Sequence, residues 1–176
     1  MEPWRRLAQT EARIAGEAVT VVGVDEAGRG PLAGPVVAAA VVLASRDGWV
    51  GLDDSKKVAP ETRQALFARV LAEARAFSWS VVGPRSIDAL NIRRASLEAM
   101  RRAVVQLRVA PDLILVDGVD RVPGIAGRQE PTVAGDGRRV GAPAVGAADP
   151  FEQVTGQEGG PVNRAGTGFQ AIREPA

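Results

Sequence analysis

Two adjacent carboxylates, Asp25 and Glu26, follow a short β-branched run and stand directly before a glycine-rich segment. The run before them, residues 21–24, is typical of a buried strand. The glycines of residues 28–34 permit backbone conformations closed to other residues and let the main chain approach a ligand closely. Acids at a strand end beside exposed backbone amides suit a cation-assisted site that acts on a phosphate. A strand that simply ends in a turn is the alternative interpretation, because Asp and Gly are common in turns.

Two further acids end predicted strands. Asp117 follows the four apolar residues 113–116, and Asp136 closes a weaker run that begins at residue 131. Acids that end separate strands can converge at one edge of a sheet, where their charges raise one another's pKa until divalent cations relieve the repulsion. Oxygen ligands without histidine or cysteine favour Mg²⁺ or Mn²⁺ over zinc, and two such ions suit an in-line phosphoryl displacement. The predicted ligands are Asp25, Glu26, Asp117 and Asp136.

The composition limits both the architecture and the chemistry. A chain of 176 residues, 45% of them apolar, is long enough for one folded domain and short for two. The absence of histidine and cysteine excludes imidazole triads, disulfides and thiolate metal sites, so catalysis depends on carboxylates, lysines or hydroxyls. No apolar run reaches the roughly 18 residues of a membrane span, and no signal peptide is apparent. We therefore expect a cytoplasmic protein that does not contact membranes.

Strands that alternate with helical patterns predict an α/β domain built around a mixed sheet. Apolar runs and alternation predict strands over residues 19–25, 35–43, 78–83 and 113–117, the first two antiparallel. Apolar residues at helical spacing predict helices over residues 4–15, 60–77 and 92–107, with another helical start at 84–88. The last of the long helices carries Arg94, Arg101 and Arg108 as a stripe, which is either a solvated face or a binding surface.

The motif over residues 23–40 strongly resembles the signature of bacterial ribonuclease HII. Other motifs of that family follow in the same order, as Asp54-Ser55-Lys56-Lys57, Leu90-Asn91-Ile92, Leu115-Val116-Asp117-Gly118 and Gly135-Asp136. The resemblance covers residues 14–136. It implies a ribonuclease H-like mixed β-sheet flanked by helices in a catalytic domain over residues 19–136, preceded by an N-terminal extension over residues 1–18.

The same resemblance implies a function. The family cleaves the RNA strand of RNA–DNA hybrids and incises duplex DNA at embedded ribonucleotides, leaving 5′-phosphate and 3′-hydroxyl ends. It implies two Mn²⁺ or Mg²⁺ ions on the four carboxylates named above, in a protein that we expect to be a monomer. Backbone groups of a glycine loop can approach the ribose 2′-hydroxyl that distinguishes RNA from DNA. The implied substrate-binding residues are Gly28, Arg29, Gly30, Ser55, Lys56, Lys57 and Asn91.

Two of these motifs have other interpretations. Lys56 and Lys57, which resemble phosphate-contacting lysines of the family, also fit a solvated loop. The glycine-rich segment could be a nucleotide-phosphate cradle, although residues 28–34 match neither the dinucleotide-binding pattern nor the P-loop pattern.

The resemblance stops after residue 136. Residues 137–176 hold eight glycines and four prolines but no leucine, lysine or tryptophan, which predicts a disordered tail. In the family an Ala/Ser-rich helix follows the Gly-Asp motif, and a later tyrosine stacks on the junction sugar, whereas this chain has no tyrosine. The C-terminal helical part is thus expected to be missing or replaced, and an impaired remnant that at most binds hybrids is the alternative to an active nuclease. A shifted reading frame is one hypothesis for the change, and translation of the other two frames tests it.

Overall fold

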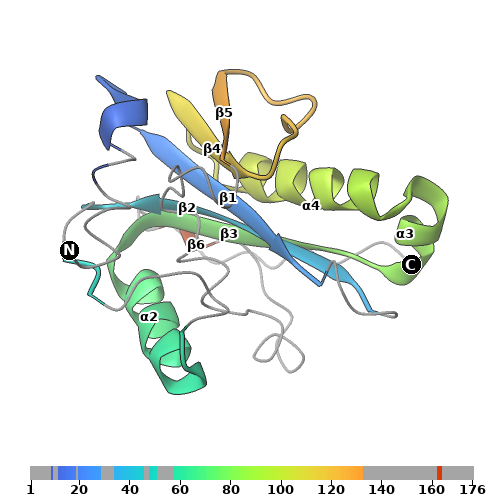
Figure 1. Cartoon of the computed structure of the whole chain (residues 1–176), viewed down its shortest axis with the longest axis horizontal. Helices are drawn as coiled ribbons and strands as arrows, with labels where there is room; N and C mark the ends of the chain where they lie inside the picture. Colours follow the sequence, from blue (N-terminus) through green and yellow to red (C-terminus); the bar gives the residue numbers. More distant parts are fainter. Residues whose placement is uncertain are drawn as a thin grey trace.

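The computed structural model describes residues 9, 12–18, 20–28, 34–45, 48–50, 58–132 and 162–163. Within these residues a mixed sheet has the strand order β5-β4-β1-β2-β3-β6 (Figure 1). The strands are β1 (Val21–Ala27), β2 (Val36–Leu43), β3 (Ala74–Val82), β4 (Leu113–Asp117), β5 (Arg128–Thr132) and β6 (Val162–Asn163). The helices are α2 (Pro60–Glu73), α3 (Pro84–Leu90) and α4 (Ile92–Gln106). The mixed sheet with flanking helices confirms the predicted fold class.

Strand pairing changes from antiparallel to parallel at β1, in the middle of the sheet. Strand β1 pairs antiparallel with β2, as predicted, and parallel with β4. The parallel register is fixed where the two strands begin, because Thr20 N donates to Asp112 Oδ2 at 2.7 Å and Asp112 N donates to Thr20 O at 2.9 Å. All four apolar residues of β4 are buried, as expected for a strand covered on both faces.

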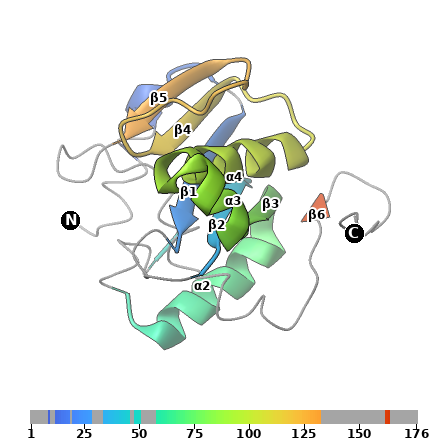
Figure 2. The ribbon, with the colours of Figure 1, turned by 90° about the vertical axis from the view of Figure 1, so that its right-hand side faces the viewer.

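Helices α4 and α2 cover opposite faces of the sheet, on either side of β2 in Figure 2. Side chains alternate along a strand. Val22 and Val24 therefore pack with α4, whereas Val41 and Phe77 pack with α2 on the other face.

Helix α4 is joined to β3 by two buried serines. Ser80 Oγ donates to the carbonyl oxygen of Ala99 at 2.6 Å, and Ser78 Oγ donates to that of Ala103. Alanines on this side of α4 leave room for the helix to approach the strand closely. Because a buried hydroxyl without a partner is costly, these bonds hold α4 at a defined position on the sheet.

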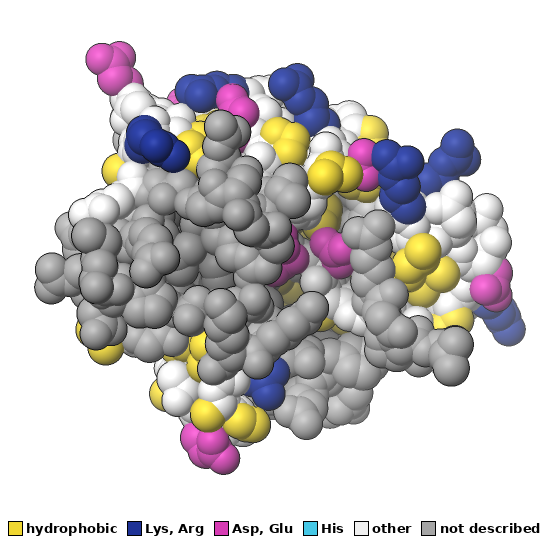
Figure 3. Space-filling view, in the orientation of Figure 1, with side chains coloured by type: hydrophobic (Ala, Val, Ile, Leu, Met, Phe, Trp, Pro, Cys, Tyr) yellow, Lys and Arg dark blue, Asp and Glu magenta, His cyan; other side chains and the backbone are white. Residues whose placement is uncertain are grey.

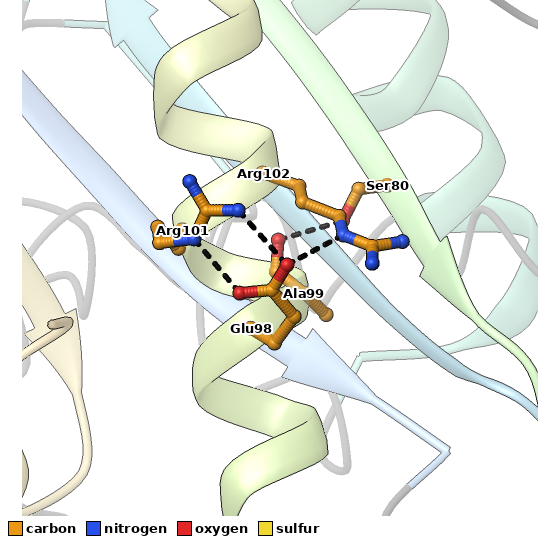
Figure 4. A network of polar contacts seen from close by, with 5 residues as sticks. All are labelled: Ser80, Glu98, Ala99, Arg101 and Arg102. Atoms are coloured by element: carbon orange, nitrogen blue, oxygen red, sulfur yellow. Dashed lines mark hydrogen bonds and ion pairs between the residues drawn. The ribbon is translucent and has the colours of Figure 1, made fainter. Parts of the chain in front are cut away.

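The outward side of α4 carries a three-residue ion network (Figure 4). Glu98 accepts from Arg101 Nε and from Arg102 Nε, each at 2.8 Å. The hydrogen bond from Arg101 is the first cause that holds the pKa of Glu98 at about 2, below its ordinary value of 4.5. The predicted arginine stripe is therefore partly neutralised, since Arg101 is paired within its own helix.

We expect Glu98→Gln to lower the free energy of unfolding at pH 7 by less than about 1 kcal/mol, the usual range for exposed ion pairs. A carboxyl with a depressed pKa stabilises the fold above its unfolded-state pKa, and this contribution is lost as the pH falls through the folded-state value. The difference between wild type and variant should therefore shrink between pH 4.5 and about 2. Urea denaturation across this range measures it, and a difference that stays constant with pH would contradict the assignment.

The helix predicted over residues 60–77 is too long, because α2 ends at Glu73. Ala74 has an extended backbone (φ −63°, ψ 141°), and Phe77 lies in β3 opposite Val41. The hydrogen-bonded ladder with β2 prevails over the helical spacing of these apolar residues, since tertiary pairing commonly overrides local propensity. Phe77 then stacks on Trp79, with ring centroids 5.7 Å apart.

Parts of the predicted terminal segments also have a place in the fold. Residues 12–15 are helical, and Ala15 packs against Val21 at the start of β1. In the predicted tail, β6 pairs antiparallel with β3 at the sheet edge, and the rest of that segment lies outside the described residues. In the part of the chain that the structure describes, no helix has the length and apolar character needed to span a membrane.

Candidate active site

Asp25 and Asp117 lie next to each other on neighbouring parallel strands. The register pairs Val24 with Val116, so the two aspartates occupy the next positions on β1 and β4. Both leave the sheet on the face opposite Val24. The two carboxyl groups lie close enough to interact, since both the charge of Asp117 and hydrogen bonding to its side chain raise the pKa of Asp25.

The surroundings of Asp25 oppose its negative charge. Burial raises its pKa well above the ordinary value of 3.8, and the charges of Asp117 and Glu26 raise it further. One contact lowers the pKa of Asp25, because Glu26 N donates a hydrogen bond to Asp25 Oδ1 at 2.7 Å. At neutral pH the aspartate pair therefore favours a bound proton or a bound cation. Two adjoining carboxylates in a site without nitrogen or sulfur ligands fit Mg²⁺ or Mn²⁺.

The other two predicted metal ligands are placed differently. Glu26 leaves the strand toward the opposite face from Asp25, although its charge still acts on that residue. Asp136 lies outside the described residues; β5 ends at Thr132, beside Asp117. Among the residues with a described placement, no group of three or more metal-ligating side chains occurs. Figure 3 shows acidic side chains close together near the middle of the molecular face.

Gly28 starts the glycine-rich segment in a conformation that only glycine fits. Its φ is +88°, and a Cβ atom built on it would lie 2.4 Å from the carbonyl oxygen of Pro35. The start of the segment therefore packs directly against Pro35, the residue that follows its end, and it leaves β1 at the strand end that carries Asp25. Arg29 and Gly30, the other predicted ribose-contacting residues, lie outside the described residues.

Asn91 joins α3 to α4. Strands β1 and β3 both end beside the start of β2, and α3 follows β3 directly. Asn91 therefore lies toward the same end of the sheet as the aspartate pair. It has φ +69°, and its Oδ1 accepts from Arg94 N at 3.1 Å, which caps α4. This capping role was missed in the sequence, although asparagine before a helical run is a known signal for it. Substrate binding by Asn91 stays a prediction.

The predicted substrate-binding residues Ser55, Lys56 and Lys57 lie outside the described residues. The chain shortly before them is firmly held. Trp49 is buried, its indole Nε1 donates to Ser45 O at 2.9 Å, and the guanidinium of Arg69 lies 4.4 Å from its ring centre. Arg69 Nη1 also donates to Gly48 O at 2.6 Å, so α2 fixes residues 48–50. No spacing in the sequence indicated this contact.

The architecture is shared with solved ribonucleases H of the second type. The chain is similar to ribonuclease H2 from Pyrococcus horikoshii OT3, with a TM-score of 0.61 and 25% identity over 80% of this chain and 79% of that one. It is also similar in fold to Bst-RNase HIII in complex with Mn²⁺, with a TM-score of 0.61 and 18% identity over 77% and 52% of the two chains. The class defined by the fold is therefore that of ribonuclease H-like proteins.

A sequence model of ribonuclease HII matches residues 22–143, which is more than half of the chain. Within the class of ribonuclease H-like proteins, the chain therefore belongs to the ribonuclease HII family. Ribonuclease HII of Agrobacterium fabrum is 48% identical over 135 residues, which are 77% of this chain and 60% of the relative. The chain thus spans about 60% of the length of the curated relatives that it matches.

Proposed function

We propose that the chain is a divalent-metal-dependent endoribonuclease that cleaves the RNA strand of RNA–DNA hybrids and incises duplex DNA at embedded ribonucleotides. The observation that carries the proposal is that Asp25 and Asp117 lie side by side on β1 and β4, where burial and the charge of Asp117 raise the pKa of Asp25 and favour a bound cation. Membership of the ribonuclease HII family supports the substrate class. The solved Mn²⁺ complex of Bst-RNase HIII supports the choice of ion.

In this proposal Asp25 and Asp117 hold the cations and Asp136 adds a further ligand. Glu26 leaves the strand on the other face but lies near enough for its charge to act on Asp25, and it contributes negative charge at the end of β1. When bound, divalent cations neutralise charge on the scissile phosphate and activate water for in-line attack. The bond between phosphorus and the 3′ oxygen breaks, so that the products carry 3′-hydroxyl and 5′-phosphate ends. The carboxylates orient these ions, and the sheet from which they project shields one side of the site from bulk water.

The remaining predicted residues recognise the substrate. Gly28, with Arg29 and Gly30, brings backbone groups to the ribose 2′-hydroxyl, the group by which RNA differs from DNA. Lys56 and Lys57 contact phosphates of the nucleic acid, and Ser55 and Asn91 belong to the same substrate-binding set. We propose a monomeric, cytoplasmic enzyme that removes ribonucleotides from DNA.

A duplex with one embedded ribonucleotide tests the proposal. We expect the full chain to nick it beside the ribonucleotide in Mn²⁺ or Mg²⁺ and to leave it intact in EDTA. An all-DNA duplex of the same sequence is the control and should not be cut. Gel analysis of end-labelled strands identifies the position and the end groups, and cleavage that persists in EDTA would contradict the proposal.

The alternative is a protein that binds hybrids without cleaving them. This alternative predicts salt-sensitive binding of the same duplex with no product in either metal.

A further inference from the structure

An ion pair connects the chain that follows Asp117 to the first turn of α4. Arg93 Nε donates to Asp120 Oδ2 at 2.8 Å, and Arg93 Nη2 donates to the other carboxylate oxygen of the same residue. The contact is bidentate, a geometry in which the planar guanidinium and carboxylate match each other. Exposed ion pairs contribute little to global stability. The importance of this one lies in what it holds in place.

The segment after Asp117 has contacts on two sides. Gly118 has φ +122°, a conformation that side-chain-bearing residues rarely adopt, and Val119 is 71% exposed. Gly118 N donates to Thr132 O at 2.9 Å, which holds the segment to β5. The ion pair to Arg93 holds it to α4. Residues 118–120 are thus fixed from both sides directly after the strand-end aspartate.

The support behind Arg93 is itself rigid. Asn91 caps α4 two residues before Arg93, and the bonds from Ser78 and Ser80 attach the same helix to β3. A side chain on such a support can restrain its partner more precisely than one on a loop.

We infer that Arg93, acting through Asp120, positions Asp117 beside Asp25 for cation binding. The inference rests on the proposed function, because it assumes that the aspartate pair holds the metal. Partners that orient metal ligands influence affinity strongly, since a small hard cation demands a narrow range of oxygen positions. Arg93 contacts Asp120 rather than the reacting groups, and it is therefore a positioning residue.

An effect of charge alone and a loss of positioning predict different changes in the affinity for cations. Arg93→Gln removes a positive charge, so any long-range field effect on the aspartate pair would tighten cation binding. Asp120→Asn removes a negative charge, so the same effect would weaken it. Loss of positioning weakens binding in both variants, and the sign of the change in Arg93→Gln separates the two explanations.

Titration of the full chain with Mn²⁺ by isothermal calorimetry tests the inference without relying on cleavage. We expect the Kd for Mn²⁺ to rise about threefold or more in Arg93→Gln and in Asp120→Asn. The double variant should be no weaker than the single ones, because all three lose the same contact. Arg93→Lys keeps the charge but loses the bidentate geometry, and it should also weaken binding.

Arg128→Gln is the matched control. It breaks the exposed pair between Arg128 and Glu130, and Arg128 lies opposite Leu113 at the other end of β4 from Asp117. The control should bind Mn²⁺ as wild type does. If wild type binds Mn²⁺ through Asp25 and Asp117 but Arg93→Gln binds equally well or more tightly, the inference is overturned and the proposed function stands. If wild type shows no binding that depends on those aspartates, both are overturned.

Discussion

Asp25→Asn should abolish metal-dependent nicking while making the metal-free protein more stable. Charge stabilisation by a bound metal is worth several kcal/mol in the transition state, and each 1.36 kcal/mol is a factor of ten in rate, so we expect a loss of roughly a thousandfold. An amide is a neutral and much weaker ligand than a carboxylate. The measurement is the initial nicking rate on the duplex with one ribonucleotide, in saturating Mn²⁺.

The gain in stability follows from the raised pKa of Asp25. A carboxyl whose folded-state pKa is raised stabilises the fold fully below its ordinary value, and this contribution is lost as the pH rises through the folded-state value. At pH 7 without metal, Asp25 therefore destabilises wild type, because the fold must either hold its charge beside Asp117 or bind a proton that the unfolded chain does not bind. Asparagine removes that cost. The advantage of the variant should disappear as the pH approaches 3.8.

Added Mn²⁺ should reverse the order of stability. A cation that binds only the folded protein stabilises wild type in proportion to its occupancy, whereas the variant gains little. Urea denaturation in EDTA and in Mn²⁺ gives both comparisons. Glu61→Gln, a change to an exposed acid in the first turn of α2, is the control and should alter neither nicking nor the response to metal. Nicking that survives Asp25→Asn unchanged would assign the activity to another site or a contaminant.

The second large effect is expected for Gly28→Ala. A side chain at φ +88° is strained by about 1–2 kcal/mol. The new methyl group would also lie 2.4 Å from Pro35 O, a backbone atom that cannot move aside by a rotamer change. Overpacking of this kind typically costs a further 1–3 kcal/mol or so. We expect a total loss of about 3 kcal/mol in the free energy of unfolding, together with reduced nicking as the segment is displaced.

Gly16→Ala separates the two causes. Gly16 also has a positive φ, +57°, but an added Cβ would meet nothing within 4 Å. This control should therefore cost about 1 kcal/mol, the conformational part alone. Urea denaturation of both variants measures the difference. Equal losses in the two would show that the contact with Pro35 is not a close one in solution.

The meeting of Asp25 and Asp117 was the most predictable part of the site. Each aspartate follows a short run of apolar residues that forms a strand. The last residues of neighbouring parallel strands lie at the same edge of a sheet. What could not be predicted is the register, which depends on the reciprocal bonds between Thr20 and Asp112. A shift by one residue would have placed the two carboxylates on opposite faces.

Other features depend on contacts that local patterns do not encode. Ala74 and Phe77 fit a helical spacing, and only the pairing with β2 makes them part of a strand. The contact of Arg69 with Trp49 joins a helix to a turn and has no periodic signature. The separation of Asp25 from Glu26 onto two faces, in contrast, follows from alternation along any strand and could be anticipated.

The parallel pairing of β1 with β4 also has a kinetic consequence. Thr20 and Asp112, which start the two strands, are 92 residues apart in the chain. Closing so long a connection is slow relative to forming α4 or the pairing of β1 with β2. A folding intermediate with those local parts in place would still lack the aspartate pair. Divalent cations should therefore slow unfolding more than they accelerate folding, because they bind only after the slowest contact of the sheet has formed.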